Sequence, residues 1–295
     1  LLVGMGGYTL VWFAKLLSRK LVVFDVFVSL YLTNVEDRAV CAPKSWKARY
    51  YAFLDKFSCR LADMVLLDTQ SQIDYFVDRY GLSQKKFLKI FVGADDEIFF
   101  PQPVAIRPDQ KKFLIHWHGH VVPFHGLNVI LDAAERLNQD SNLQFRIVTR
   151  AGSQCEKIKA AAARKGLSNI TFFPETDYPG LARLINEADI CLGIFGKNKK
   201  AEVVIPNKIF EAIACGKPII TADTSAVREV FMDLHNCLLC PADSAGELAA
   251  AIRKLAGGRN LRNAVGNGGR ELYLKKFLPS IAVLDLVKFL RASIE

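Results

Sequence analysis

The sequence lacks the features that mark several classes of protein. Its uncharged opening, Leu1 to Ala14, is shorter than the ~20 apolar residues of a membrane-spanning helix and is interrupted by glycines. No basic stretch precedes it, as one would in a signal peptide. The chain has no short-period repeat and no low-complexity tract. Because it begins with Leu in the middle of an apolar pattern, we expect its natural beginning to be missing.

The cysteines exclude a disulfide-stapled scaffold. There are seven of them, an odd number, and they show no framework spacing. A reduced, cytoplasmic compartment fits this usage best. The one C-x-x-C, from Cys237 to Cys240, encloses two leucines and has no second pair, so we interpret it as strand core rather than as a metal or redox site.

The chain also has no dense block of one charge. Its 295 residues are 51% hydrophobic and carry 39 Lys and Arg against 30 Asp and Glu, for a net charge of +9. Most of that excess follows Ala105, where 26 basic residues face 19 acidic ones. Without a basic arm we expect no nucleic-acid partner, while the later segment should attract anions such as phosphates.

What the sequence does contain is an alternation of short apolar runs and amphipathic segments, which predicts parallel sheets covered by helices. A Pro-rich linker over 99–110 separates two such series. We therefore expect an α/β protein with a Rossmann-like domain over 1–105, incomplete at its start, and a second one over 106–278. A terminal helix over 279–295 could pack back on the first domain. Strands are predicted at 1–4, 21–28, 64–67, 87–92, 112–118, 144–149, 170–173, 190–194, 218–221 and 237–239.

The most informative segment runs from Pro206 to Pro218. Proline near the start and Gly216 just past the end predict a short helix with a firm stop. Its free N–H groups and Lys208 could cradle a phosphate, and Glu211, one turn later, could accept both hydroxyls of a ribose. From spacing alone, an ordinary surface Lys–Glu pair is the favoured interpretation.

This segment resembles the nucleotide-sugar signature of retaining glycosyltransferases of family 4, in the branch with Pro-x-Lys-x-x-Glu. The loop from Gly119 to Gly126 stands where that family has Gly-Arg…Lys-Gly, and 224–229 and 236–241 match later landmarks. The resemblance implies a GT-B fold, in which two doubly wound domains face a cleft, the second binding the donor nucleotide and the first the acceptor. It also implies a metal-independent reaction. The donor-binding residues it implies are Gly119, His120, His125, Gly126, Asn207, Lys208 and Glu211.

Two departures from the family pattern affect the expected chemistry. His120 and His125 replace the Arg and Lys that hold the diphosphate, and imidazoles can still donate hydrogen bonds there. The first acid of the family's Glu-x7-Glu falls at Val203, so the nearest acid is Glu202. We expect Glu202 and Lys208 to act in catalysis, and Asp25, at the end of an apolar strand, to touch acceptor.

Two further patterns have competing interpretations. His116, His118 and His120 could form a His-x-His-x-His metal strand, but Gly119 predicts that the strand ends before His120, and no carboxylate is spaced to complete a site. The first two could equally be core histidines with hydrogen-bond partners. The Gly4–Gly7 stretch lacks the third glycine of a dinucleotide fingerprint, and we interpret it as a tight turn before a helix.

Together these patterns predict an enzyme that moves a hexosyl unit from a nucleoside-diphosphate sugar to a carbohydrate or lipid-linked acceptor, in cell-surface polysaccharide or glycolipid synthesis. The aromatic and basic stretch from Val11 to Lys20 could contact the inner face of an anionic membrane, or it could pack on its own sheet. A sugar-nucleotide 2-epimerase of the same fold, a metal-dependent hydrolase and a non-catalytic nucleotide-binding module remain alternatives.

Overall fold

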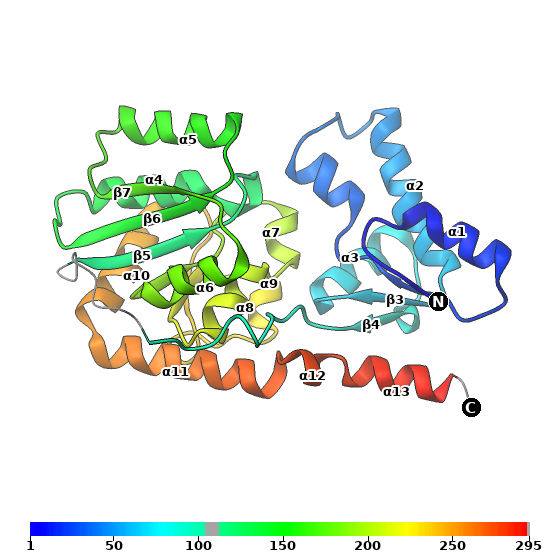
Figure 1. Ribbon diagram of the computed structural model, residues 1–295. Helices are drawn as coiled ribbons and strands as arrows, with labels where there is room; N and C mark the ends of the chain where they lie inside the picture. Colours follow the sequence, from blue (N-terminus) through cyan, green and yellow to red (C-terminus); the bar gives the residue numbers. More distant parts are fainter. Residues whose placement is uncertain (104–111, 294–295) are drawn as a thin grey trace. The chain divides into compact units, whose positions relative to one another are not determined.

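The computed structural model describes residues 1–103 and 112–293, which form two α/β units (Figure 1). Unit 1 comprises Leu1–Val92, Asn198–Ile205 and the chain from Ser280 onward. Unit 2 comprises Gly93–Lys197 and Pro206–Pro279. The division therefore falls at Val92 rather than within the Pro-rich stretch, and a short internal segment returns to unit 1. Positions 104–110 of the predicted linker lie outside the described residues.

Unit 1 contains a parallel sheet in the order β1-β2-β3-β4. Its strands are β1 (Leu2–Val3), β2 (Val23–Asp25), β3 (Met64–Leu67) and β4 (Phe87–Lys89). The helices of this unit are α1 (Tyr8–Leu17), the π-helix Leu32–Asp37, α2 (Trp46–Leu61), α3 (Gln70–Tyr80), the 3-10 turn Gln84–Lys86, α7 (Lys199–Val203) and α13 (Leu284–Ala292), while α12 (Pro279–Ala282) bridges the division between the units. The strands predicted in this unit are confirmed. The turn predicted before α1 is also confirmed, because the Gly7 amide donates to the Gly4 carbonyl at 3.0 Å.

Side-chain caps fix where α2 and α3 of unit 1 begin. Ser45 accepts from the Ala48 amide at 3.2 Å at the start of α2, and Thr69 accepts from the Gln72 amide at 3.0 Å at the start of α3. Each cap satisfies one of the amides that a helix leaves without a partner. Gly81, at φ +65°, ends α3 in the left-handed region that favours glycine.

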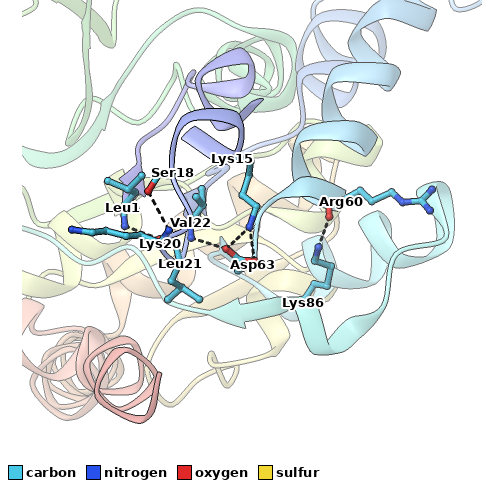
Figure 2. Close-up of polar contacts among 9 residues, drawn as sticks. All are labelled: Leu1, Lys15, Ser18, Lys20, Leu21, Val22, Arg60, Asp63 and Lys86. Atoms are coloured by element: carbon cyan, nitrogen blue, oxygen red, sulfur yellow. Dashed lines mark hydrogen bonds and ion pairs between the residues drawn. The ribbon is translucent and has the colours of Figure 1, made fainter. Parts of the chain in front are cut away.

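Asp63, between α2 and β3, ties α1 to the start of β2 (Figure 2). Its carboxylate accepts from Lys15 Nζ at 2.9 Å and from the Val22 amide at 2.7 Å. Partial burial pushes the pKa of Asp63 upward, but the Val22 amide and Lys15 outweigh it and hold that pKa below its ordinary value. The same close-up shows Lys86 donating to the Arg60 carbonyl at the end of α2.

Unit 2 contains a six-stranded parallel sheet in the order β10-β9-β8-β5-β6-β7. Its strands are β5 (Phe113–His118), β6 (Leu143–Thr149), β7 (Ile170–Pro174), β8 (Ile190–Leu192), β9 (Ile219–Ala222) and β10 (Leu238–Cys240). Its helices are the 3-10 turn Pro123–His125, α4 (Leu127–Arg136), α5 (Ser153–Arg164), α6 (Tyr178–Glu187), α8 (Asn207–Ala214), α9 (Ser225–Arg228), α10 (Ala245–Gly257) and α11 (Arg259–Lys276).

The strand order of unit 2 locates its ligand crevice. From β5 the chain proceeds to β6 and β7 on one side, then returns to β8 on the other side of β5. The strand order reverses between β5 and β8, and ligands of doubly wound sheets bind outside the carboxyl ends of the strands at such a switch point. The expected α/β fold with a parallel, Rossmann-like sheet is confirmed for both units, and the reversal of strand order is seen in unit 2.

Apolar burial accounts for the stability of this sheet. Ile115, Trp117, Phe145 and Ile147 are fully buried between the helices that cover its faces. The interpretation of the C-x-x-C as core is also confirmed, because Cys237 and Cys240 are buried free thiols at β10. Among the described residues, no helix is long and apolar enough to cross a bilayer.

Candidate functional site

The switch point of unit 2 is built on Trp117, the penultimate residue of β5. Its indole is fully buried, and Nε1 donates to the Gly193 carbonyl just after β8 at 3.1 Å. This bond joins the ends of the two strands between which the order reverses. The face of its indole ring contacts a side chain from α8 (Asn207–Ala214).

That side chain is Lys208. It is the second residue of α8, is only 5% exposed, and holds Nζ 4.2 Å from the centre of the Trp117 ring. Among the residues that the structure describes, Nζ is the only buried cationic nitrogen without a hydrogen-bond partner. Burial holds the pKa of Lys208 well below its ordinary value, although the Glu211 carboxylate opposes that shift. No side chain caps the amino end of α8, which begins after Pro206.

The loop after β5 brings two more of the predicted residues to the same ammonium. At Gly119, φ +136°, a Cβ would lie 3.0 Å from Lys208 Nζ and 3.3 Å from His125 Cε1, so only glycine leaves this space open. His125 is buried, and its Nδ1 lies 2.6 Å from the His120 carbonyl. A carbonyl can only accept, so Nδ1 carries a proton, and Nε2 can donate to a ligand only when the ring is cationic.

The remaining loop positions have simpler roles. Gly126, at φ +66°, starts α4 so close to the Gly196 amide that a Cβ would collide with it. The side chains of His120 and Asn207 are exposed, the latter at the first residue of α8. The structure therefore brings Gly119, His125, Lys208 and Glu211 into one site of unit 2, and Gly126 ends the loop where α4 begins.

Glu211 is fixed by a histidine. Its side chain, 9% exposed, receives a hydrogen bond through Oε2 from His118 Nε2 at 2.6 Å. His118 Nδ1 lies 3.0 Å from His116 Nε2, and Arg146 in β6 donates from Nε to His116 Nδ1 at 3.2 Å. Of the two interpretations of these histidines, the one with hydrogen-bond partners is correct, and all four of their ring nitrogens have protein partners.

Sequence reasoning missed Trp117, His118 and Arg146 as members of this site. The alternation of side chains along a strand predicts that His116 and His118 share one face of β5. It does not identify the residues that lie beside them. His116 is the register partner of Arg146, and that pairing follows only once β5 and β6 are known to be adjacent. Among the described residues, no group of three or more His, Cys, Asp or Glu side chains could hold a metal ion.

The other two predicted residues, Asp25 and Glu202, belong to unit 1. Asp25 ends β2, and burial raises its pKa although the Phe27 amide lowers it. Phe27, at φ +61°, is a bulky residue in the left-handed region, a strained conformation that tends to occur at functional positions. Glu202 is half-buried on α7, whose first turn is capped by Asn198.

Comparison with solved structures defines the class of fold. Sucrose-phosphate synthase from Thermosynechococcus elongatus superposes with a TM-score of 0.81 at 16% identity, over 99% of this chain and 72% of that one. The Anabaena protein HepE, in complex with UDP, gives a TM-score of 0.78 at 15% identity, over 99% and 78% of the two chains. The two Rossmann-like units thus have the GT-B fold of glycosyltransferases.

The sequence comparisons show which family the chain resembles. Residues 112–257 match the family described as glycosyl transferases group 1. The putative colanic acid biosynthesis glycosyl transferase WcaI of Escherichia coli K12 is 31% identical over 187 residues, which is 55% of this chain and 44% of WcaI. The chain spans about half the length of the curated relatives it matches.

Proposed function

We propose that the protein transfers a hexosyl unit from a nucleoside-diphosphate sugar to an acceptor hydroxyl, with retention at the anomeric carbon. The observation that carries this proposal is the buried ammonium of Lys208, which has no hydrogen-bond partner among the described residues. A buried cation without partners is costly, and a bound anion restores its lost interactions. A diphosphate is such an anion, and HepE binds UDP in the same fold. Retention rests on the resemblance of 206–218 to the family 4 signature.

Each donor-site residue then has a defined role. Lys208 and the amino end of α8, including Asn207, bind the diphosphate, while the bare backbone at Gly119 gives it room. Cationic His125 donates from Nε2 to the diphosphate, and exposed His120 in the same loop also donates to it. Glu211 accepts the two ribose hydroxyls, because His118 holds only its Oε2.

The same residues supply the chemistry of bond cleavage. The barrier lies in separating an oxocarbenium-like sugar from a diphosphate that gains negative charge, so fixed donors at that diphosphate stabilise the transition state most. Lys208 and His125 provide this positive charge, and we therefore propose a metal-independent reaction. In unit 1, Asp25 contacts the acceptor and Glu202 the transferred sugar.

A surface of unit 1 supports a membrane-bound acceptor. Helices α1 and α2 pack together through Trp12, whose ring meets Phe53 and Phe57 edge-on at 5.8 and 5.4 Å. Beside these rings α1 exposes Leu16 by 79% and Leu17 by 81%. The segment that holds α1, the loop after it and α2 also carries the basic residues Lys15, Arg19, Lys20, Lys47, Arg49 and Lys56, of which Lys15 pairs with Asp63. Exposed apolar side chains on a segment that also carries cations suit an anionic bilayer, so we propose that the enzyme works at the cytoplasmic face of the cell membrane.

Liposome flotation tests this surface. We expect the wild-type protein to float with vesicles that contain anionic lipid and to remain below with neutral ones. Leu16→Ser combined with Leu17→Ser should abolish flotation. Leu284→Ser on α13, where the side chain is 49% exposed, serves as the matched control and should float like the wild type. Absence of wild-type flotation would contradict membrane contact and leave the donor site untouched.

The donor site is tested by calorimetric titration with UDP, GDP and ADP. We expect one of them to bind, and Glu211→Ala to weaken it more than Glu202→Ala does. His125→Ala should also weaken it. If none of the three nucleotides binds, the proposed function is wrong. If Glu202→Ala has the larger effect, the two acids exchange roles.

Retention is tested with the nucleotide sugar of the best-binding base. Proton NMR of the released or transferred sugar reports its anomeric configuration before mutarotation. We expect the first product to keep the configuration of the donor. A product of opposite configuration would refute retention while leaving nucleotide binding intact.

A further inference from the structure

We propose that Arg146, which lies in β6 and touches no proposed ligand atom, is a positioning residue that acts through His116 and His118 to orient the Glu211 carboxylate toward the ribose. The inference rests on the proposed role of Glu211 and extends it by three residues that the family signature does not include. Its basis is the continuous chain of hydrogen bonds from Arg146 to Glu211.

The chemistry of arginine fixes the direction of this chain. A guanidinium has no acceptor, so His116 Nδ1 must accept from Arg146 Nε and cannot carry a proton. The proton of His116 then sits on Nε2 and is donated to His118 Nδ1. His118 in turn carries its proton on Nε2 and donates it to Glu211 Oε2. Every hydrogen position in the relay follows from the arginine at its end.

The same logic fixes the charge on the histidine beside Glu211. A cationic His118 would carry a proton on Nδ1 as well, and His116 would have to accept at both of its nitrogens, which a neutral imidazole cannot do. The Arg146 bond therefore keeps His118 neutral, so this histidine adds no positive charge beside Glu211. Burial, together with the nearby Arg146 and Lys208, also holds the pKa of His116 well below its ordinary value.

The far end of the relay is anchored outside the strands. Arg146 Nη1 donates to Glu187 Oε2 at 2.6 Å, and Nη2 donates to the Leu184 carbonyl, both in α6. The Arg146 side chain is 6% exposed, so these bonds hold a buried guanidinium in one orientation. Arg146 is thus held by α6. Its Nε–H fixes the direction of the hydrogen bonds from His116 to His118 in β5.

The experiment measures how well the protein distinguishes a ribonucleotide from its 2′,3′-dideoxy form. The probe is the best-binding of UDP, GDP and ADP, and the readout is the ratio of the two dissociation constants. We expect the wild type to favour the ribonucleotide by roughly tenfold or more, the equivalent of one charge-assisted hydrogen bond. Glu211→Ala should bring the ratio close to one.

Variants of the relay separate orientation from folding. Arg146→Met and His116→Phe should lose at least half of the wild-type discrimination on a logarithmic scale, with dideoxynucleotide affinity unchanged within twofold. His116→Gln keeps one donor and one acceptor and should restore discrimination. Glu187→Gln is the matched control, since it leaves the Arg146 Nε bond in place and should discriminate like the wild type.

The outcomes distinguish the two proposals. If the wild type discriminates but Arg146→Met and His116→Phe match it, the relay is wrong and the role of Glu211 stands. If the wild type binds both forms equally, the ribose role of Glu211 fails and the relay fails with it. A uniform loss of affinity for both forms in the Phe and Gln variants alike would show a structural role only.

Discussion

Two buried lysines eight residues apart have opposite environments. Lys200, in α7 of unit 1, and Lys208, in α8 of unit 2, are each 5% exposed. Lys200 Nζ bonds Thr33 Oγ1 at 3.2 Å and lies 3.9 Å from Asp37 Oδ2. Lys208 has an indole beneath it and no hydrogen-bond acceptor among the described residues.

Burial alone therefore does not mark a functional cation. Desolvation lowers the pKa of both ammonium groups, in Lys200 to about 8 with Asp37 opposing it. What differs is that unit 1 provides oxygen partners for its lysine, whereas unit 2 leaves its lysine for a ligand. A buried charge that has oxygen partners within the protein, as Lys200 has, stabilises the fold. A buried charge without a hydrogen-bond partner at a switch point, as in Lys208, indicates a binding site.

The largest expected effect tests the saturated lysine. Lys200→Met should destabilise unit 1 by about 3–5 kcal/mol, because the buried Asp37 carboxylate loses its nearby cation. Thermal and urea unfolding measure this loss. Nucleotide affinity of the folded protein should stay the same. A variant as stable as the wild type would mean that Lys200 is not structural, and the comparison between the two lysines would fail.

The next effect tests the unsatisfied lysine. Lys208→Met should weaken binding of the best nucleotide by about 10- to 100-fold, the range expected for loss of a charge-assisted hydrogen bond. The melting temperature of the ligand-free protein should not fall, because a buried amine without a hydrogen-bond partner is removed. A large drop in that temperature with unchanged affinity would assign Lys208 to the structure instead.

A third effect sharpens the comparison within unit 2. The folded-state pKa of His116 lies well below its ordinary value of about 6.5, so the unfolded chain binds an extra proton as the pH falls below 6.5. Stability from this group is fully present above that pH and is lost below it, by at most about 1.4 kcal/mol per pH unit.

Urea unfolding at pH 7.5, 6.5 and 5.5 measures this slope. His116→Gln removes the titrating group and should flatten it. His235→Gln, a substitution of an exposed histidine, is the control and should keep the wild-type slope. Identical slopes in all three proteins would show that His116 is not held neutral.

The smallest effect concerns a charge that water reaches. Asp63 is partly exposed, and solvent can replace Lys15 and the Val22 amide as its partners. Asp63→Ala should cost about 1 kcal/mol of unfolding free energy, the net value of an ordinary hydrogen bond. Urea unfolding measures this loss of unfolding free energy. A loss as large as that of Lys200→Met would mean that solvent exposure does not make the interactions of Asp63 weaker than those of buried Lys200.

Much of the fold could be predicted from the sequence, because strand existence depends on local apolar runs. The runs at 64–67 and 113–118 stand out between polar segments, and the turn at Gly4–Gly7 follows from glycine chemistry. The division into units was less accessible. That Asn198–Ile205 returns to unit 1 depends on tertiary packing against α3 and the π-helix, for which the local sequence has no signal.

The site divides in the same way. Lys208 and Glu211 could be selected from a short motif, and Gly119 and His125 from a glycine-bounded loop. The partners that define their chemistry come from other elements. Trp117 meets Lys208 only when α8 folds onto the end of β5, and Arg146 meets His116 only through strand register.

The most direct test of the central claim is a crystal structure of the protein with the nucleoside diphosphate that binds best. We predict a diphosphate oxygen within about 3 Å of Lys208 Nζ and the ribose hydroxyls on Glu211. A nucleotide bound elsewhere, with the Lys208 ammonium still lacking a partner, would contradict the account.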